Sequence, residues 1–208
     1  MARRMNAASM GTQLSTWQSA GYCGRGNVEP LIGALRDRTV VVCGNAEGVF
    51  NELQMVCSAL EQPVIFAVND VGAYLPKVNH WVTLHGAYVH AWSNVRWNHL
   101  LGRVDNIHAI SDDGFEINHV WDGLTPLMSL SGYFAMQIAH IMGAGEIILC
   151  GCPGNSARRF FDLTMRDDLN MYEGCRRQLI EECQRLPELK AKVRSTSGWT
   201  KEFFGGPK

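Results

Sequence analysis

Short apolar runs alternate with amphipathic segments along most of the chain. The runs predict strands at 39–43, 63–68, 80–85, 106–111 and 146–150, with a more exposed strand at 190–196. Between them, apolar residues recur three and four positions apart, which is typical of helices. Helices are expected at 27–38, 47–60, 87–101, 131–142, about 166–186 and 197–205. Residues 112–129 hold several Asp, Gly and Pro residues and are expected to form a loop.

Strands that alternate with helices predict a parallel sheet with helices on its faces. The run TVVVC at 39–43 is apolar on both faces, as in a central parallel strand. Right-handed crossovers then give an α/β fold with a Rossmann-like, doubly wound, mainly parallel sheet. We expect a single domain over 27–208. The N-terminal arm over 1–26 is rich in Gly, Ser, Ala, Asn and Gln and has no core of its own.

Composition and charge remove several classes of function. The formal net charge is −1 over 208 residues, with no basic face that would predict a nucleic-acid partner. The sequence contains no apolar stretch long enough to predict a membrane span. The seven cysteines are odd in number and include no CxxC pair, which favours reduced, buried thiols. The alternative is a metal site built from Cys43, Cys150 and Cys152 at neighbouring strand ends.

Polar and glycine residues follow several of the predicted strands. In a doubly wound sheet, ligands bind at the carboxyl ends of the strands, near the switch in strand order. Free N–H groups at helix starts favour anions, and Asn amides both donate and accept hydrogen bonds, so these features predict a nucleotide pocket. CGNAEG at 43–48 is neither GxGxxG nor a Walker A loop, and an ordinary strand-to-helix turn explains it equally well. The candidates are Gly44, Asn45, Asn69, Asp70, His85, Ser131, Gly132 and Gly151.

Three segments resemble a known family: VVVCGNAEGVFNEL, VIFAVND and SLSGYFAMQIAHIMGAGEIILCGC. Their order and spacing are similar to those of bacterial sialyltransferases that use CMP-sialic acid, of the related 6-hydroxymethylpterin diphosphokinase-like family, and of short bacteriophage proteins. The resemblance covers roughly residues 39–155. It implies that Asn45, Asn69, Ser131 and Gly132 hold the CMP part of a CMP-sugar or other nucleotide donor, flanked by Gly44 and Gly151. It also implies that no cofactor or metal is required.

The chain departs from this family at positions that bear on catalysis. Glu47 lies near a position that is usually serine, where a carboxylate would repel a phosphate. No histidine follows His140, so the family's general base has no counterpart. General base catalysis needs a group within reach whose pKa is near the working pH. His85 is therefore the first candidate for the base and Asp70 the second, with Asp112 as a further alternative.

Two functions of different class follow. The first is a nucleotide-binding, glycosyltransferase-like enzyme whose partner is a nucleotide or nucleotide-sugar. The second is a non-catalytic, phage-type structural or binding module that keeps the fold and holds a protein partner through residues 1–26 and the aromatic segment 199–204. An open cleft ringed by the candidates favours the enzyme, whereas a cleft filled by Trp81, Tyr133 or the arm favours the module.

A hydrolase or kinase acting on a pterin or nucleotide is a third candidate, which rests on the wider family alone. The expected location is the cytoplasm, or the host cytoplasm or virion for a phage-encoded chain. Neither a membrane nor a nucleic acid is expected as a partner.

Overall fold

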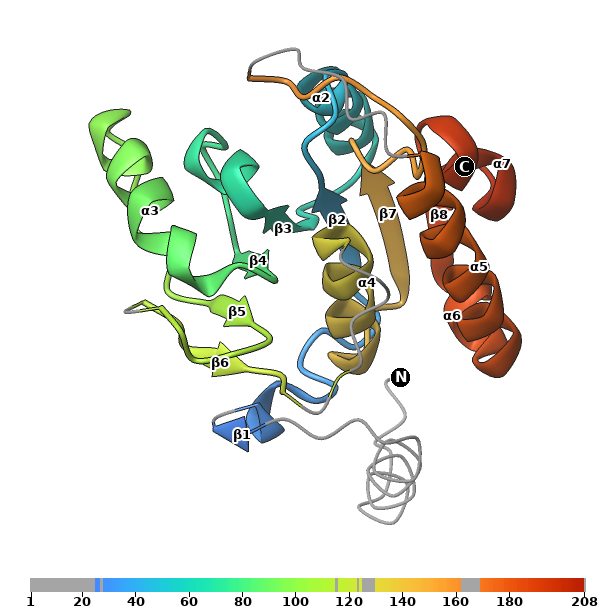
Figure 1. Ribbon diagram of the computed structural model, residues 1–208, viewed down its shortest axis with the longest axis horizontal. Helices are drawn as coiled ribbons and strands as arrows, with labels where there is room; N and C mark the ends of the chain where they lie inside the picture. The colour runs from blue at the N-terminus through green and yellow to red at the C-terminus, as the bar shows by residue number, and fades with distance from the viewer. Residues whose placement is uncertain are drawn as a thin grey trace.

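The computed structural model describes residues 25–26, 28–114, 116–122, 124, 130–161 and 169–207. Its strands are β1 (Arg25–Gly26), β2 (Thr39–Cys43), β3 (Val64–Val68), β4 (His80–Thr83), β5 (Ile107–Ala109), β6 (His119–Val120), β7 (Glu146–Cys150) and β8 (Val193–Ser195). They form one sheet in the order β1-β6-β5-β4-β3-β2-β7-β8 (Figure 1). Every neighbouring pair is parallel except β1 with β6. The predicted α/β class with a mainly parallel sheet is therefore confirmed.

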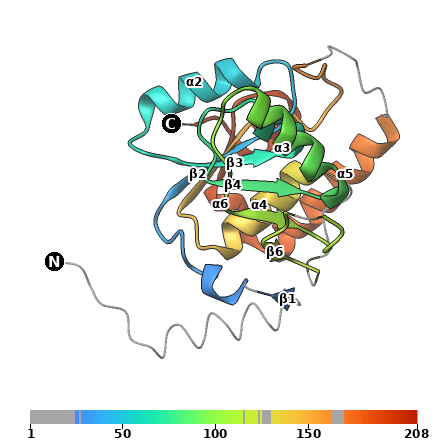
Figure 2. The same ribbon diagram turned by 90° about the vertical axis from the view of Figure 1, so that its left-hand side faces the viewer.

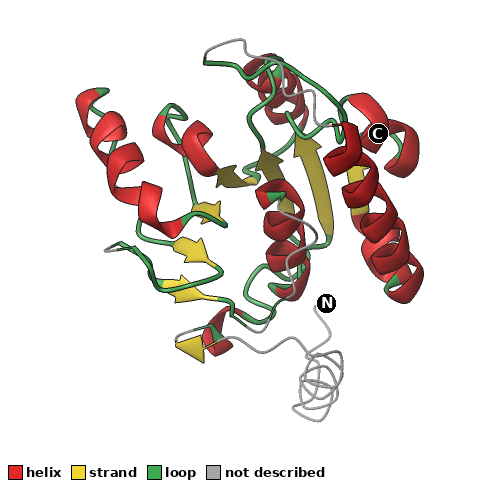
Figure 3. Cartoon of the chain, in the orientation of Figure 1, coloured by secondary structure: helices red, strands yellow, loops and turns green. Residues whose placement is uncertain are grey.

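Helices cover both faces of this sheet. They are η1 (Glu29–Leu31), α2 (Val49–Ala59), η2 (Asn69–Ala73), η3 (Gly86–Tyr88), α3 (Val89–Asn98), α4 (Ser131–Ile141), α5 (Leu169–Arg185), α6 (Pro187–Lys192) and α7 (Gly198–Phe204). In Figure 2, α2 and α3 lie on one side of the strands, and α4 and α5 lie on the other. Figure 3 shows how helices and strands alternate along the described chain. No helix within the described ranges combines the length and apolar character needed to cross a bilayer.

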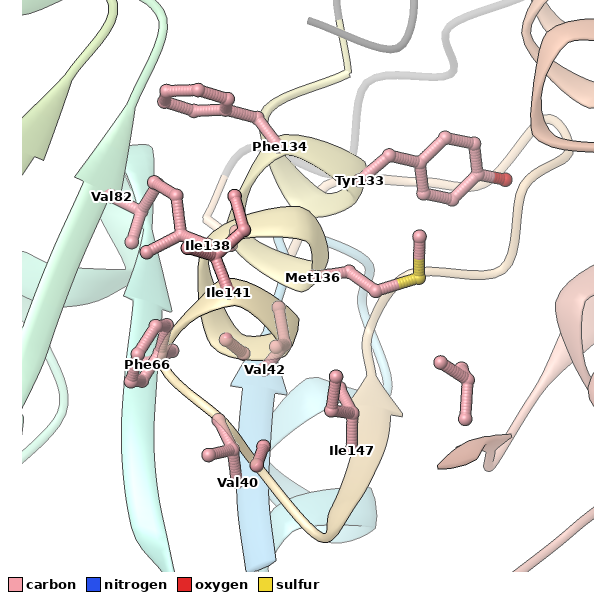
Figure 4. Packing of buried hydrophobic residues seen from close by; sticks show 14 of the residues in the cluster. Val40, Val42, Phe66, Val82, Tyr133, Phe134, Met136, Ile138, Ile141 and Ile147 are labelled. Atoms are coloured by element: carbon pink, nitrogen blue, oxygen red, sulfur yellow. The ribbon is translucent and has the colours of Figure 1, made fainter. Parts of the chain in front are cut away.

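The central strand β2 contributes to two separate cores. Val40 and Val42 pack in the cluster that includes α4, while Val41 and Cys43 pack in the cluster that includes α2. Figure 4 shows Ile138 and Ile141 of α4 against this first face of the strands. Because alternate side chains of a strand point to opposite faces, a strand covered on both sides must be apolar throughout. This explains why the TVVVC run predicted the strand at its observed bounds.

The helix expected over 27–38 is wrong. Only Glu29–Leu31 is helical, as a single 3₁₀ turn. Asp37 has φ 60°, a left-handed conformation that ends any right-handed helix there. Arg36 instead forms an antiparallel bridge with Ala144. The segment therefore leads into β2 as a series of turns.

Other boundaries also differ from the expectation. The strand expected at 190–196 begins only at Val193, because Pro187 starts the short helix α6. The expected loop 112–129 contains β6, whose two residues are too few to give a periodic pattern. Of the predicted arm, residues 1–24 lie outside the described residues, and Arg25–Gly26 pairs with β6. Residues 166–168 of the expected long helix also lie outside the description.

Gly151→Ala is expected to destabilise the fold by about 2–4 kcal/mol. Gly151 has φ 64°, and a Cβ atom built there would lie 2.7 Å from the Cβ of Val49. Gly102→Ala is the matched control, because a Cβ there meets nothing within 4 Å. Urea unfolding of both variants measures the difference. A loss of less than about 1 kcal/mol for Gly151→Ala would contradict the close packing of Gly151 against Val49.

Candidate functional site

The strand order places a switch point beside β2. From β2 the chain proceeds through β3, β4, β5 and β6 on one side, and β7 then pairs with the other side of β2. The loops that follow β2 and β7 therefore run to opposite faces and separate at the carboxyl edge of the sheet. This is the position at which open α/β sheets form ligand crevices.

A cleft of about 680 Å³ lies at this edge. Its volume is in the range of small-molecule binding sites. Eight of the candidate residues predicted from the sequence line it: Gly44, Asn45, Asn69, Asp70, His85, Ser131, Gly132 and Gly151. Asp112, the further alternative for the base, is not among the residues that line it. The structure thus brings together residues from the ends of β2, β3, β4 and β7 and from the start of α4. Their individual roles remain predictions.

The first loop is held by protein hydrogen bonds rather than open to an anion. Gly44 N donates to Cys150 O at 2.8 Å, and Ala46 N donates to Gly151 O at 3.1 Å. A Cβ atom on Gly44 would lie 2.4 Å from Gly151 O, so the glycine there permits close packing of two strand ends. Glu47 is exposed and does not line the cleft. Its carboxylate is therefore not among the groups that a cleft ligand would meet.

Asn45 and Asp70 form a polar pair between the ends of β2 and β3. The side-chain Nδ2 of Asn45 donates to Asp70 Oδ1. This hydrogen bond fixes the orientation of the amide, because a carboxylate oxygen can only accept. Asn45 Oδ1 is buried and receives no hydrogen bond from the described residues.

Asn69 connects the second loop to β4. It has φ 53°, a conformation that asparagine adopts more readily than most residues. Its Oδ1 accepts from Thr83 Oγ1 at 2.8 Å, and its carbonyl accepts from the indole Nε1 of Trp81 at 2.5 Å. Trp81 is thus buried beneath this loop and does not fill the cleft. The amide nitrogen of Asn69 is the part of its side chain left for a ligand.

The amino end of α4 supplies the electropositive side of the cleft. Tyr133 N and Phe134 N already donate to Leu130 O, whereas the N–H groups of Ser131 and Gly132 precede these helical bonds. Such N–H groups, with the helix dipole, favour a negative group. Ser131 Oγ accepts a long hydrogen bond, 3.4 Å, from Leu84 N. The serine is therefore anchored to the end of β4 and keeps its hydroxyl proton for another acceptor.

Two arginines add positive charge to the cleft, and neither was predicted from the sequence. Arg158 and Arg159 line the cleft from the loop after β7. This loop folds back on the first one: Glu47 N donates to Arg158 O at 2.8 Å, and Ala46 bridges Arg159. The guanidinium of Arg159 lies 4.6 Å from the ring centre of Phe161. Only this tertiary fold-back, which no spacing in the sequence indicates, brings the cations to the cleft.

His85 lies on the exposed rim beside aromatic side chains. Its backbone N–H donates to Thr83 Oγ1 at 2.8 Å, which fixes the turn after β4. Its imidazole lies edge-on to Tyr88, 6.2 Å between ring centres, and Tyr88 stacks on Trp92 at 5.9 Å. These three side chains line the cleft together. The His85 imidazole therefore lies at the edge of the cleft, next to an aromatic surface.

The cysteines near the cleft are protonated thiols. Burial, the largest cause, raises the pKa of Cys152 to about 12 and that of Cys43 well above its usual value. Within the part of the chain that the structure describes, no group of three or more His, Cys, Asp or Glu side chains is arranged to hold a metal ion. The alternative of a metal site at Cys43, Cys150 and Cys152 therefore has no geometric support there.

Comparison of the chain with protein-family models, with curated proteins and with solved structures finds no significant match. The resemblance seen in the sequence therefore stays a prediction. What the site can do follows from its own geometry.

Proposed function

We propose that the chain binds a nucleotide in this cleft and acts as a glycosyltransferase-like enzyme with a CMP-sugar as donor. One observation carries the proposal. Candidate residues that the sequence pattern predicts in several separate chain segments line a single cleft at the switch point of the sheet. A nucleoside monophosphate is of a size that fits a cleft of about 680 Å³.

The charges of the cleft suit a ligand with one anionic part and one hydroxyl-bearing part. Arg158, Arg159 and the amino end of α4 favour a phosphate. Asp70 instead brings a carboxylate, which favours the hydroxyl or amino groups of a nucleoside or sugar. A sugar nucleotide has both kinds of group. This polarity supports the donor substrate that the family resemblance implies.

Transfer with inversion would proceed as follows. His85 takes the proton of an acceptor hydroxyl, whose oxygen attacks the anomeric carbon of the sugar. The bond between that carbon and the phosphate oxygen breaks, and CMP leaves with the bonding electron pair. The arginines and the α4 amino end offset the charge that develops on the leaving phosphate. Asp70, hydrogen-bonded to Asn45, is better placed to bind the donor than to act as the base.

The non-catalytic module remains the second candidate. For this candidate we expect a cleft filled by Trp81, Tyr133 or the arm. Trp81 is buried beneath η2, and Tyr133 forms part of the wall. Residues 1–24 of the arm lie outside the described residues, so this part of the expectation stays a prediction. Within the described part, a cleft that Trp81 does not fill supports ligand binding. Absence of nucleotide binding would return the module to first place.

Asn45→Ala and Asn69→Gly should each weaken CMP binding by roughly 1–3 kcal/mol, because each leaves ligand groups unpaired. Glycine is chosen at Asn69 because it accepts the φ of 53° found there. Isothermal titration calorimetry of each variant with CMP measures the effect. Asn94→Ala, an exposed position on α3 outside the cleft, serves as the control. Unchanged affinity in both cleft variants would remove these residues from the site.

A further inference from the structure

Three aromatic side chains form a stack that runs from the core to the rim of the cleft. They are Trp81, which is 1% exposed, Trp92, which is partly buried, and Tyr88, which is 60% exposed. The ring centres of Trp81 and Trp92 lie 6.4 Å apart, and those of Trp92 and Tyr88 lie 5.9 Å apart. Aromatic rings stacked at such separations attract one another. The exposed tyrosine is thus the outer end of a stack whose inner end is buried.

The inner end of the stack is fixed by η2. Gly72 leaves room for the Trp81 indole, because a Cβ atom on this glycine would clash with the ring. The indole Nε1 of Trp81 donates to Asn69 O at 2.5 Å. Tyr88 and Trp92 are four residues apart where η3 continues into α3, so their side chains are neighbours. Tyr88 is therefore held in position before any ligand binds, which lowers the entropic cost of binding to it.

The stack reaches the cleft beside the proposed base. Tyr88 and Trp92 line the cleft together with His85, whose ring centre lies 6.2 Å from that of Tyr88. Leu84, the residue before His85, donates its N–H to Ser131 Oγ at the amino end of α4. The exposed tyrosine therefore lies close both to the histidine and to the side of the cleft that favours a phosphate.

Exposure of an aromatic ring is not by itself a sign of a binding site. Trp97, which is also on α3, is 74% exposed and lies outside the cleft. Tyr88 differs because it is stacked, lines the cleft and lies beside His85. A sugar ring carries C–H groups that pack on the electron-rich face of an aromatic ring, while its hydroxyl groups remain available. An aromatic wall with a few placed polar groups is typical of small-molecule sites.

We infer that Tyr88 binds the acceptor of the transfer reaction and that this acceptor is a sugar. The inference rests on the proposed function and adds to it the chemical class of the second substrate. Transfer requires the acceptor oxygen to approach the donor carbon to about 3–3.5 Å. A sugar ring packed on the exposed part of Tyr88 brings a hydroxyl group to the His85 imidazole, on the side of the cleft that favours the donor phosphate. A nucleobase also stacks on aromatic rings, and the affinity for CMP separates the two ligands.

The test compares wild type with Tyr88→Ala, with Tyr88→Phe and with the control Trp97→Ala. Release of CMP from CMP-sialic acid is measured against the concentration of methyl glycosides of common hexoses. Sorbitol is the matched compound that has hydroxyl groups but no ring. Titration calorimetry of each variant gives its affinity for CMP, which also shows that the cleft is intact.

At least one glycoside should stimulate CMP release by wild type, and sorbitol should not. For that glycoside, Tyr88→Ala should raise KM by roughly tenfold with little change in kcat, because packing on the ring is the same in the ground state and the transition state. Tyr88→Phe keeps the ring and should stay within about twofold of the wild-type KM, as should Trp97→Ala. The affinity for CMP should be unchanged in all three variants.

The outcomes separate the inference from the proposed function. If CMP binds wild type but no glycoside stimulates its release more than sorbitol does, the inference is wrong and the nucleotide site stands. An unchanged glycoside KM in Tyr88→Ala leads to the same conclusion. If Tyr88→Ala weakens the binding of CMP itself, the ring contacts the nucleotide and the inference is also wrong. If CMP does not bind wild type, both fail.

Discussion

Stability should fall steeply between about pH 6.5 and pH 4, because His80, His108 and His140 are buried as neutral rings. Burial is the main cause that lowers the pKa of His80 and His140 to about 4 and that of His108 well below its usual value. In this window the unfolded chain binds protons that the folded chain does not. The stability is therefore complete above about pH 6.5 and is lost toward pH 4, by roughly 3 kcal/mol for each of His80 and His140.

For His80 and His108, a chain of hydrogen bonds adds to the effect of burial. The indole N–H of Trp121 donates to His108 Nδ1 at 3.1 Å, so that nitrogen carries no proton. Neutral His108 therefore has its proton on Nε2 and donates it to His80 Nδ1, 2.9 Å away. A proton on either Nδ1 atom would put two donors face to face. The charge of one ring would also act on the next.

Urea unfolding at several pH values tests this expectation. His80→Phe keeps an aromatic ring against Phe66, 4.5 Å between ring centres in the wild type, and removes one titrating group. Its stability should be lower at pH 7, because His108 loses an acceptor, and should fall less steeply toward pH 4 than that of wild type. His90→Ala, at an exposed position, should give the wild-type slope. Parallel curves for His80→Phe and wild type would be the contrary result.

Arg96→Met is expected to destabilise the fold by about 3–5 kcal/mol. The Arg96 side chain is 4% exposed. Its guanidinium donates to Gly72 O at 2.8 Å, Leu75 O at 2.6 Å and Gly102 O at 2.5 Å. Methionine fills similar space but leaves these buried carbonyls unpaired. The same carbonyls belong largely to η2 and its continuation, so the variant should also weaken nucleotide binding through Asn69 and Asp70.

Arg103→Met provides the matched control for this prediction. Arg103 lies on the surface, 3.8 Å from Asp105, and both side chains are mostly exposed. Surface ion pairs of this kind contribute at most about 1 kcal/mol. Chemical denaturation of both variants gives the comparison. Equal, small losses for Arg96→Met and Arg103→Met would show that the buried guanidinium does not hold the second loop.

The elements predicted at their true positions are those whose pattern arises from burial on both faces. β2 and β7 have the expected bounds, since runs such as EIILC cannot be exposed on either side. The pattern fails where few residues contribute. β6 has two residues and β1 has two, and their pairing depends on contacts made across the sheet. The helix predicted over 27–38 rested on apolar residues spaced four apart in a short segment. That spacing does not produce a helix there, because the segment forms turns.

The candidate site likewise has residues that the sequence pattern predicts and residues that only tertiary contacts bring to the cleft. Asn45, Asn69, Ser131 and their flanking glycines were predictable, because topology alone places strand ends and helix starts at one edge. Arg158 and Arg159 were not recognised as site residues. The arginines reach the cleft only because their loop bridges back to Ala46.

The central claim, that the cleft binds a cytidine nucleotide, is tested most directly by thermal unfolding with a panel of ligands. The panel contains CMP, UMP, GDP, ATP, CMP-sialic acid and UDP-sugars. A ligand at about 100 times its Kd adds roughly 2.7 kcal/mol of stability, which raises the Tm of a chain of this size by several degrees. We expect this rise with CMP and CMP-sialic acid and little or none with the other nucleotides. No rise with any nucleotide would contradict the claim and favour the non-catalytic module.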